Sequence, residues 1–174
     1  MTDVPASGSG DEPPVSRAVL DTVVEPGAQV ADNVVEQPPA LRPIAGGRHE
    51  ARERAVHLLY ECEIKGLPVE QVLASQVLAP EAYTDDLVRG VAARREELDA
   101  TIAELARGWT LQRMPRLDVV VMRVACYELA HRPDVPRGVV LAEAVDLAGR
   151  YGTDDSARFV NGLLSTAAER LRPE

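Results

Sequence analysis

The stretch "MPRLDVVVMRVACYELAH", residues 114–131, decides the fold because it is apolar on nearly every side. A surface helix carries its apolar residues on one stripe, whereas a helix that is apolar all round is buried. We therefore predict a central buried helix here. The "RPDVP" that follows ends this helix, because its two prolines lack the N–H groups that a continuing helix needs.

Apolar residues recur at helical spacing on both sides of this segment. Further helices are expected within residues 48–66, 67–78, 80–108 and 137–152, and a last one after Thr153, which suits its cap. The second of these is expected to bury one face, formed by Val69, Val72, Leu73 and Val77. Residues 80–108 fit either one long helix or two with a bend near Arg94 and Arg95. No segment alternates like a strand, so we predict an all-α fold.

Residues 1–47 differ in composition from the rest of the chain. They hold seven acids, two arginines and seven of the 13 prolines, with a net charge of −5. Segments rich in charge and proline bury too little apolar surface to fold. We predict a flexible, disordered acidic tail over residues 1–47 and one helical domain over residues 48–174, long enough to bury a core without disulfides.

The residues give little support to an enzyme or a metal site. His49 and Glu53 lie one helical turn apart, yet no third ligand accompanies them and an ordinary charged face explains them. The sequence contains no phosphate-binding glycine loop and no nucleophile elbow, so we expect no catalytic residue, cofactor or metal. No run of about 20 apolar residues predicts a membrane span. Cys62 and Cys126 lack CxxC spacing and favour a reduced, cytoplasmic protein.

Basic residues at the start of the first expected helix suggest RNA binding. Arg48, His49 and Arg52 fall at i, i+1 and i+4, so they share one side of the helix. Guanidinium groups suit phosphate oxygens. Glu50 and Glu53 alternate with these bases, and ion pairing within the helix explains the same pattern without RNA.

Three blocks, in order and at matching spacing, resemble the NusB family of transcription antitermination and ribosomal RNA biogenesis factors. They are "ARERAVHLLYE" (51–61), "GWTLQRMPRLDVVVMRVACYEL" (108–129) and "DVPRGVVLAEAVDLAGRYGTDDSARFVNGLL" (134–164). The resemblance covers roughly residues 48–171 and implies a compact bundle of about seven helices in two packed halves. It also implies binding of boxA-type single-stranded RNA on nascent ribosomal transcripts with the ribosomal protein NusE, within an RNA polymerase elongation complex that contains other Nus factors.

The resemblance assigns roles to single positions. The RNA-binding residues that it implies lie at the start of the first helix and after the "YG" turn: Arg48, His49, Arg52, Asp155, Arg158 and Phe159. The partner-binding residue that it implies is Asp118, in the segment that contacts NusE in relatives. We expect the arginines and the phenylalanine ring to form one groove for unpaired nucleotides.

Two other functions suit a helical domain of this kind. The first is a protein-interaction scaffold that does not bind RNA. The second is part of a ribosomal RNA 5-methylcytosine methyltransferase system, because NusB-like domains precede the catalytic part of some of these enzymes. The 174 residues leave no room for a methyl-donor-binding domain, which disfavours the second. The sequence does not distinguish a monomer from a homodimer.

The stretch "RFVNGLL", residues 158–164, leaves two questions about the last helix. Its periodicity favours Phe159 as a core residue, whereas the resemblance favours a partly exposed ring that stacks on an unpaired base. Gly162 costs a helix interior about 1 kcal/mol relative to alanine. We therefore expect the backbone of another helix to approach closely at Gly162.

Overall fold

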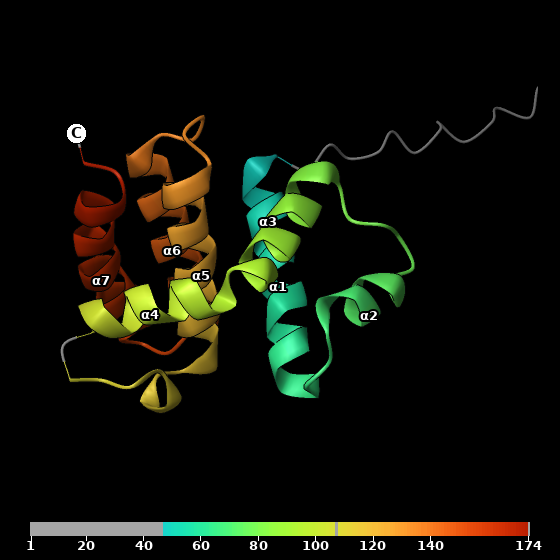
Figure 1. Ribbon diagram of the computed structural model, residues 1–174, viewed down its shortest axis with the longest axis horizontal. Coiled ribbons are helices and arrows are strands. Elements are labelled where there is room, and N and C mark those ends of the chain that lie inside the picture. Colours follow the sequence, from blue (N-terminus) through green and yellow to red (C-terminus); the bar gives the residue numbers. More distant parts are fainter. Residues whose placement is uncertain (1–46, 107, 174) are drawn as a thin grey trace, which may run out of the picture. The chain divides into compact units, whose positions relative to one another are not determined.

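Figure 1 shows the computed structural model of the protein, in which residues 47–106 and 108–173 are described. These residues form seven α-helices and no strand, which confirms the predicted all-α class. The helices are α1 (Arg48–Lys65), α2 (Val69–Ala74), α3 (Ala82–Ala93), α4 (Arg95–Leu105), α5 (Arg116–His131), α6 (Arg137–Tyr151) and α7 (Ser156–Leu171), and a 3-10 turn, Leu111–Arg113, precedes α5. The tail predicted for residues 1–47 lies, except for Gly47, outside the described residues.

Helix α5 is the centre of the bundle, as its all-round apolar sequence predicts. Twelve of its sixteen residues are buried, and it packs against α1, α3, α4, α6 and α7. Helices α1, α2 and α3 contact one another on one side of it, whereas α4 crosses α5 and α7 on the other (Figure 1). The two packed halves of the bundle therefore meet along α5.

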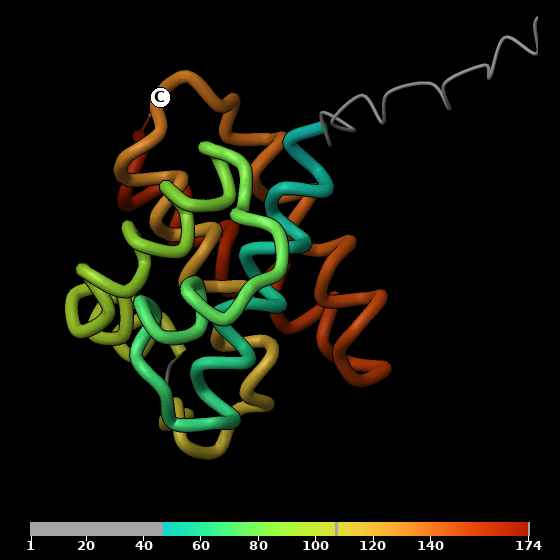
Figure 2. Tube along the Cα trace, turned by 90° about the vertical axis from the view of Figure 1, so that its right-hand side faces the viewer, coloured from blue at the N-terminus to red at the C-terminus, as the bar shows by residue number. Residues whose placement is uncertain are grey.

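Helix α1 packs against α3, and its side chains also contact α6; Figure 2 shows α1 from a second direction. The Thr84 hydroxyl of α3 donates a hydrogen bond to the Ala51 carbonyl of α1, with the oxygens 3.2 Å apart. On the other side, His49 Nδ1 lies 2.7 Å from a Glu143 carboxylate oxygen of α6. These contacts fix the N-terminal half of α1, where the predicted RNA-binding arginines lie.

The ends of two helices test the predicted boundaries. Residues 82–105 form two helices that meet at Arg94, which selects the bent alternative. The prediction that Val77 belongs to the buried face of a helix is wrong, because α2 ends at Ala74 and Val77 is 99% exposed. Ser75 donates its hydroxyl to the Val72 carbonyl, 2.8 Å away. Serine competes in this way for backbone groups and favours the end of a helix over its continuation.

Two glycines inside helices have opposite surroundings. A Cβ atom built on Gly90 of α3 would overlap the ring of Tyr127, whose side chain is buried in the core. A Cβ atom on Gly162 of α7 would meet nothing within 4 Å. The prediction that another backbone packs closely on Gly162 is therefore wrong, and the helix carries this glycine without a packing reason.

The two glycines make a matched test of this difference. We expect Gly90→Ala to lower the free energy of unfolding by about 1–3 kcal/mol, because the Tyr127 ring must move within a packed core. We expect Gly162→Ala to raise it by up to about 1 kcal/mol, since alanine favours the helix and meets open space. Urea unfolding followed by circular dichroism measures both. A destabilised Gly162→Ala variant would contradict the second expectation.

Candidate functional site

A groove of about 810 Å³ lies between α4, the segment before α5, and α7. Trp109 and Phe159 line it, with their ring centroids 6.3 Å apart, and Trp109 is 56% exposed. The Arg113 guanidinium lies 5.9 Å from the centroid of the Trp109 ring system. Gly162 also lines the groove, where the absence of a side chain keeps the space open. The groove thus offers apolar ring faces and close access to the backbone of α7.

A buried carboxylate lines the same groove. Asp118, near the start of α5, is buried, and its Oδ2 accepts a hydrogen bond from the Ser156 hydroxyl at 2.9 Å. Its Oδ1 is buried and has no hydrogen-bond partner among the described residues. Burial raises the pKa of Asp118 above its usual range, although the Ser156 hydrogen bond opposes this shift. A buried carboxylate oxygen without a donor is costly, so a ligand that supplies one gains by it.

The "YGTDDS" turn before α7 positions Ser156. The Thr153 N–H donates to the Ser156 hydroxyl oxygen at 2.8 Å, and the two hydroxyl oxygens lie 3.0 Å apart. The Ser156 hydroxyl proton is used toward Asp118, so the Thr153 hydroxyl is the donor of the second contact. Thr153 does not cap α7 as predicted, since α7 has no side-chain cap hydrogen bond. A Cβ on Gly152 would overlap Ser156, so only glycine allows this tight turn.

The predicted residues after the turn lie at or near this groove. Asp155, Arg158 and Phe159 line it together with Asp118. Phe159 is partly buried and packs against the core. Its environment is therefore intermediate between the core residue and the exposed ring that the sequence left open. Arg158 and Asp155 are exposed and form an ion pair at 3.2 Å. The predicted partner-binding position, Asp118 of the middle block, and the predicted RNA-binding positions of the C-terminal block are thus neighbours.

Arg52 lies elsewhere and is not an exposed cation. It is 2% exposed, and its Nε and Nη2 donate to the two carboxylate oxygens of Glu128 at 2.9 and 2.8 Å. The Tyr83 hydroxyl donates to the same carboxylate. Burial and the contact with Glu128 raise the pKa of Tyr83 to about 12. The expectation that Arg52 presents its guanidinium to RNA is wrong, because its guanidinium holds α1 to α5.

Arg48 and His49 lie nearer the surface at the same end of α1. Arg48 is exposed and forms an ion pair with Asp134 at 2.9 Å. His49 is partly buried against Glu143, and its Nε2 has no hydrogen-bond partner among the described residues. The structure thus leaves Arg48 as the accessible cation of the three predicted positions.

The two groups of predicted residues lie at opposite ends of α5. Asp118 marks the groove and Glu128 marks the Arg52 contact, and ten residues of helix separate them by about 15 Å. The expectation of one groove formed by the arginines and Phe159 together is therefore wrong. Trp109 is the groove residue that sequence reasoning missed, because it lies in a non-repetitive segment where periodicity gives no signal.

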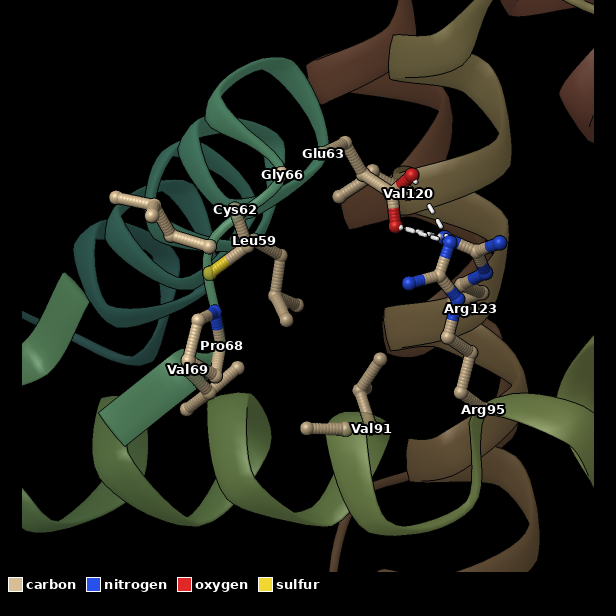
Figure 3. Close-up of a pocket in the computed structure, with 12 residues that line it drawn as sticks. Leu59, Cys62, Glu63, Gly66, Pro68, Val69, Val91, Arg95, Val120 and Arg123 are labelled. Atoms are coloured by element: carbon tan, nitrogen blue, oxygen red, sulfur yellow. Dashed lines mark hydrogen bonds and ion pairs between the residues drawn. The ribbon is translucent and has the colours of Figure 1, made fainter. Parts of the chain in front are cut away.

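A second hollow, of about 610 Å³, lies between α1, α2, α3 and α5 (Figure 3). Its walls are largely apolar, and Glu63 at its mouth contacts Arg95 at 2.7 Å and Arg123 at 3.0 Å. These charges are paired with one another, so this hollow lacks the unpaired acceptor that the groove offers. In the described part of the chain, no cluster of three or more His, Cys, Asp or Glu side chains is arranged to bind a metal ion. None of the described helices is long and apolar enough to cross a membrane.

The family model and similar curated proteins point to the same family. The sequence model of the NusB family matches residues 49–169. The chain is 45% identical over 136 residues to the transcription antitermination protein NusB of Saccharopolyspora erythraea, covering 73% of this chain and 92% of that protein. It is 43% identical over 129 residues to the protein of the same name from Thermobifida fusca, covering 72% and 91%.

Solved structures agree with the sequence comparison. T. maritima NusB has a TM-score of 0.66 at 30% identity, over 72% of this chain and 93% of that one. A crystal structure of antitermination factors NusB and NusE in complex with dsRNA has a TM-score of 0.61 at 25% identity, over 71% and 96%.

The unpaired Asp118 oxygen predicts a pH-dependent stability difference. The raised pKa of Asp118 means that the folded state binds its proton more tightly than the unfolded state does. Stability therefore falls as the pH rises through this pKa. We expect Asp118→Asn to have a higher urea midpoint than the wild type at pH 7, because a buried unpaired amide costs less than a carboxylate. The difference should shrink in acid.

The exposed Asp155→Asn variant is the control for this prediction and should leave the midpoint nearly unchanged at either pH. An Asp118→Asn midpoint equal to or below that of the wild type at pH 7 would contradict the assignment of Asp118 as an unsatisfied carboxylate.

Proposed function

The chain belongs to the NusB family, and we propose that it is a transcription antitermination factor that binds RNA together with the ribosomal protein NusE. The RNA is boxA-type, single-stranded and part of nascent ribosomal transcripts, and the complex acts on elongating RNA polymerase with other Nus factors. The protein works in the cytoplasm as an adaptor and performs no catalytic step.

The observation that carries the site assignment is the Asp118 oxygen that has no partner among the described residues, beside the two rings that line the groove, Trp109 and Phe159. A carboxylate accepts hydrogen bonds most strongly from charged or backbone donors, which a protein partner supplies. We assign Asp118 and the adjoining wall to NusE. Phe159 and Arg158 then face RNA, with the ring available to stack on an unpaired base.

The start of α1 supplies a second, electrostatic contact. Arg48 lies where it can meet RNA phosphates. His49 beside it is paired with Glu143, and Arg52 acts as a positioning residue through Glu128. The chain carries a net charge of −9, and RNA affinity depends on the number of phosphates that cations neutralise. The protein alone is therefore a weak RNA binder that needs its partner for stable binding.

An electrophoretic shift with boxA-type RNA, performed with and without NusE, tests this function. We expect a weak shift or none with the full chain alone and a clear shift when NusE is added. Binding of NusE without any RNA shift would favour a protein-interaction scaffold. No binding of either component would contradict the proposal.

Phe159→Ala tests the stacking role of the ring. Stacking of a base on an aromatic side chain contributes about 1–3 kcal/mol, so we expect RNA affinity of the NusE complex to fall about 5- to 150-fold. Thermal melting gives the accompanying loss of stability. A variant that melts early and binds RNA normally would return Phe159 to a purely structural role.

Gly162→Leu tests whether the open groove is needed. The leucine should fill the groove and weaken complex formation at least tenfold without lowering the melting temperature, since a Cβ at this position meets nothing within 4 Å. Asn161→Leu is the matched control, because Asn161 is exposed on the same helix and does not line the groove. Equal effects of the two substitutions would contradict a role for the groove.

A further inference from the structure

The segment that ends α5 places a carboxylate between two arginines. Asp134 Oδ2 lies 2.9 Å from Arg48 Nη2, and its Oδ1 lies 3.2 Å from Arg132 Nε. Two guanidinium groups that hold two oxygens of one anion form the arrangement that proteins also use for phosphate. The three residues belong to α1 and to the "RPDVP" break, a motif that the proposed function has not used.

The two arginines are also held by an aromatic ring. The Cζ atoms of Arg48 and Arg132 lie 4.9 and 4.8 Å from the centroid of the Tyr83 ring. The Tyr83 hydroxyl is bound to the buried Glu128 carboxylate, which fixes the ring. Cation–π contacts of this length orient guanidinium groups. The arginines therefore keep their positions when the Asp134 carboxylate is removed.

The backbone of the segment is fixed, so that only the Asp134 side chain needs to move. Arg172 donates hydrogen bonds to the Arg132 carbonyl at 3.0 Å and to the Val135 carbonyl at 2.5 Å. Val135 is buried in the core. The Asp134 carboxylate lies between these two anchored positions and is about half exposed.

The exposure of these groups decides which ion pair can exchange. The Arg48–Asp134 pair is accessible to water, and exposed pairs contribute little because solvent screens them. The Arg52–Glu128 pair is buried, and breaking such a pair leaves an uncompensated charge. Hydrogen bonds from Arg132 and Arg48 lower the pKa of Asp134, so that its carboxylate is charged at neutral pH. Arg132 keeps a second partner, Asp86, at 2.5 Å.

We propose that Arg48 and Arg132 form a phosphate clamp that Asp134 fills in the free protein and that an RNA phosphate takes over on binding. The inference rests on the proposed RNA-binding function and adds Arg132 as a contact residue and Asp134 as a built-in competitor. The competitor lowers affinity for RNA in general. RNA that is also held at the groove by NusE displaces it.

The test measures the affinity of the full chain with NusE for a fluorescent boxA-type RNA by anisotropy, over a series of salt concentrations. We expect Asp134→Asn to bind about three- to tenfold tighter at low salt, because the competing charge is gone while the clamp remains. We expect Arg132→Gln to bind more weakly and to lower the slope of log K against log salt by about one unit, the signature of one lost phosphate contact.

Two variants control for trivial causes. Asp134→Glu keeps the competing charge and should leave affinity near that of the wild type. Glu96→Gln removes one exposed carboxylate from α4, so it measures the effect of net charge alone. Thermal melting confirms that each variant is folded.

Either of two results would overturn the clamp: Asp134→Asn tightening RNA binding no more than Glu96→Gln does, or Arg132→Gln leaving the salt slope unchanged. A change in NusE affinity without a change in RNA affinity would also overturn it and identify a protein contact instead. Failure of the wild-type complex to bind RNA at all would refute the proposed function itself, which separates the two hypotheses.

Discussion

Helix α5 is buried along most of its length and yet carries a carboxylate near each end, and different helices donate hydrogen bonds to these two groups. Both oxygens of Glu128 are bonded, whereas among the described residues only one oxygen of Asp118 has a partner. Ser156 of α7 donates to Asp118, whereas Arg52 of α1 and Tyr83 of α3 donate to Glu128. A buried charge must be paired or hydrogen-bonded to be tolerated. The requirement therefore fixes where α1 and α7 lie relative to α5, and with them the two candidate contact surfaces.

The C-terminal end of α5 shows the same constraint at the level of the backbone. The last carbonyls of a helix have no partner within the helix and need another donor. Arg172 donates to the Leu129 carbonyl at 2.9 Å, in addition to its bonds to the following segment. It also donates at 2.6 Å to the Glu128 carbonyl, which accepts the Arg132 N–H as well. A residue near the end of the chain thus holds the break that carries Arg132 and Asp134. The positions of Arg132 and Asp134 at the surface therefore depend on the hydrogen bonds of Arg172.

Periodicity predicted most of the fold, because burial on one face or on all faces leaves a pattern that a single sequence displays. It predicted α5 and left the bend at Arg94 as one of two alternatives, and it failed where the decisive contact is between helices. Arg52 falls at i, i+4 and i+7 with Val56 and Leu59, which are both buried, so a signal for its burial was present. The positive charge of Arg52 nevertheless favoured the prediction of an exposed, RNA-binding residue. The buried Glu128 carboxylate with which it pairs lies 76 residues away in the sequence.

The candidate site was less predictable, because its features run against the usual preferences for residues in helices and for buried polar groups. Gly162 weakens its helix without a packing need, and Asp118 keeps a buried oxygen that none of the described residues pairs. Such local conflicts concentrate at functional sites. A sequence shows that a glycine is costly in a helix but does not show whether a neighbour or an open groove requires it. Trp109, in a segment without periodicity, gives no burial pattern at all.

The rigidity of α5 also limits what can occupy both surfaces at once. Asp118 at the groove and Glu128 at the Arg52 contact are about 15 Å apart along the α5 axis, and the packed core prevents that spacing from changing. A single base or a free phosphate is too short to reach from the groove to Arg48. An extended RNA strand, or a partner protein that carries RNA across the bundle, spans the distance. In the proposed function, two contacts of modest strength act together on one RNA strand, so an acidic protein gains affinity for RNA by geometry where its net charge opposes binding.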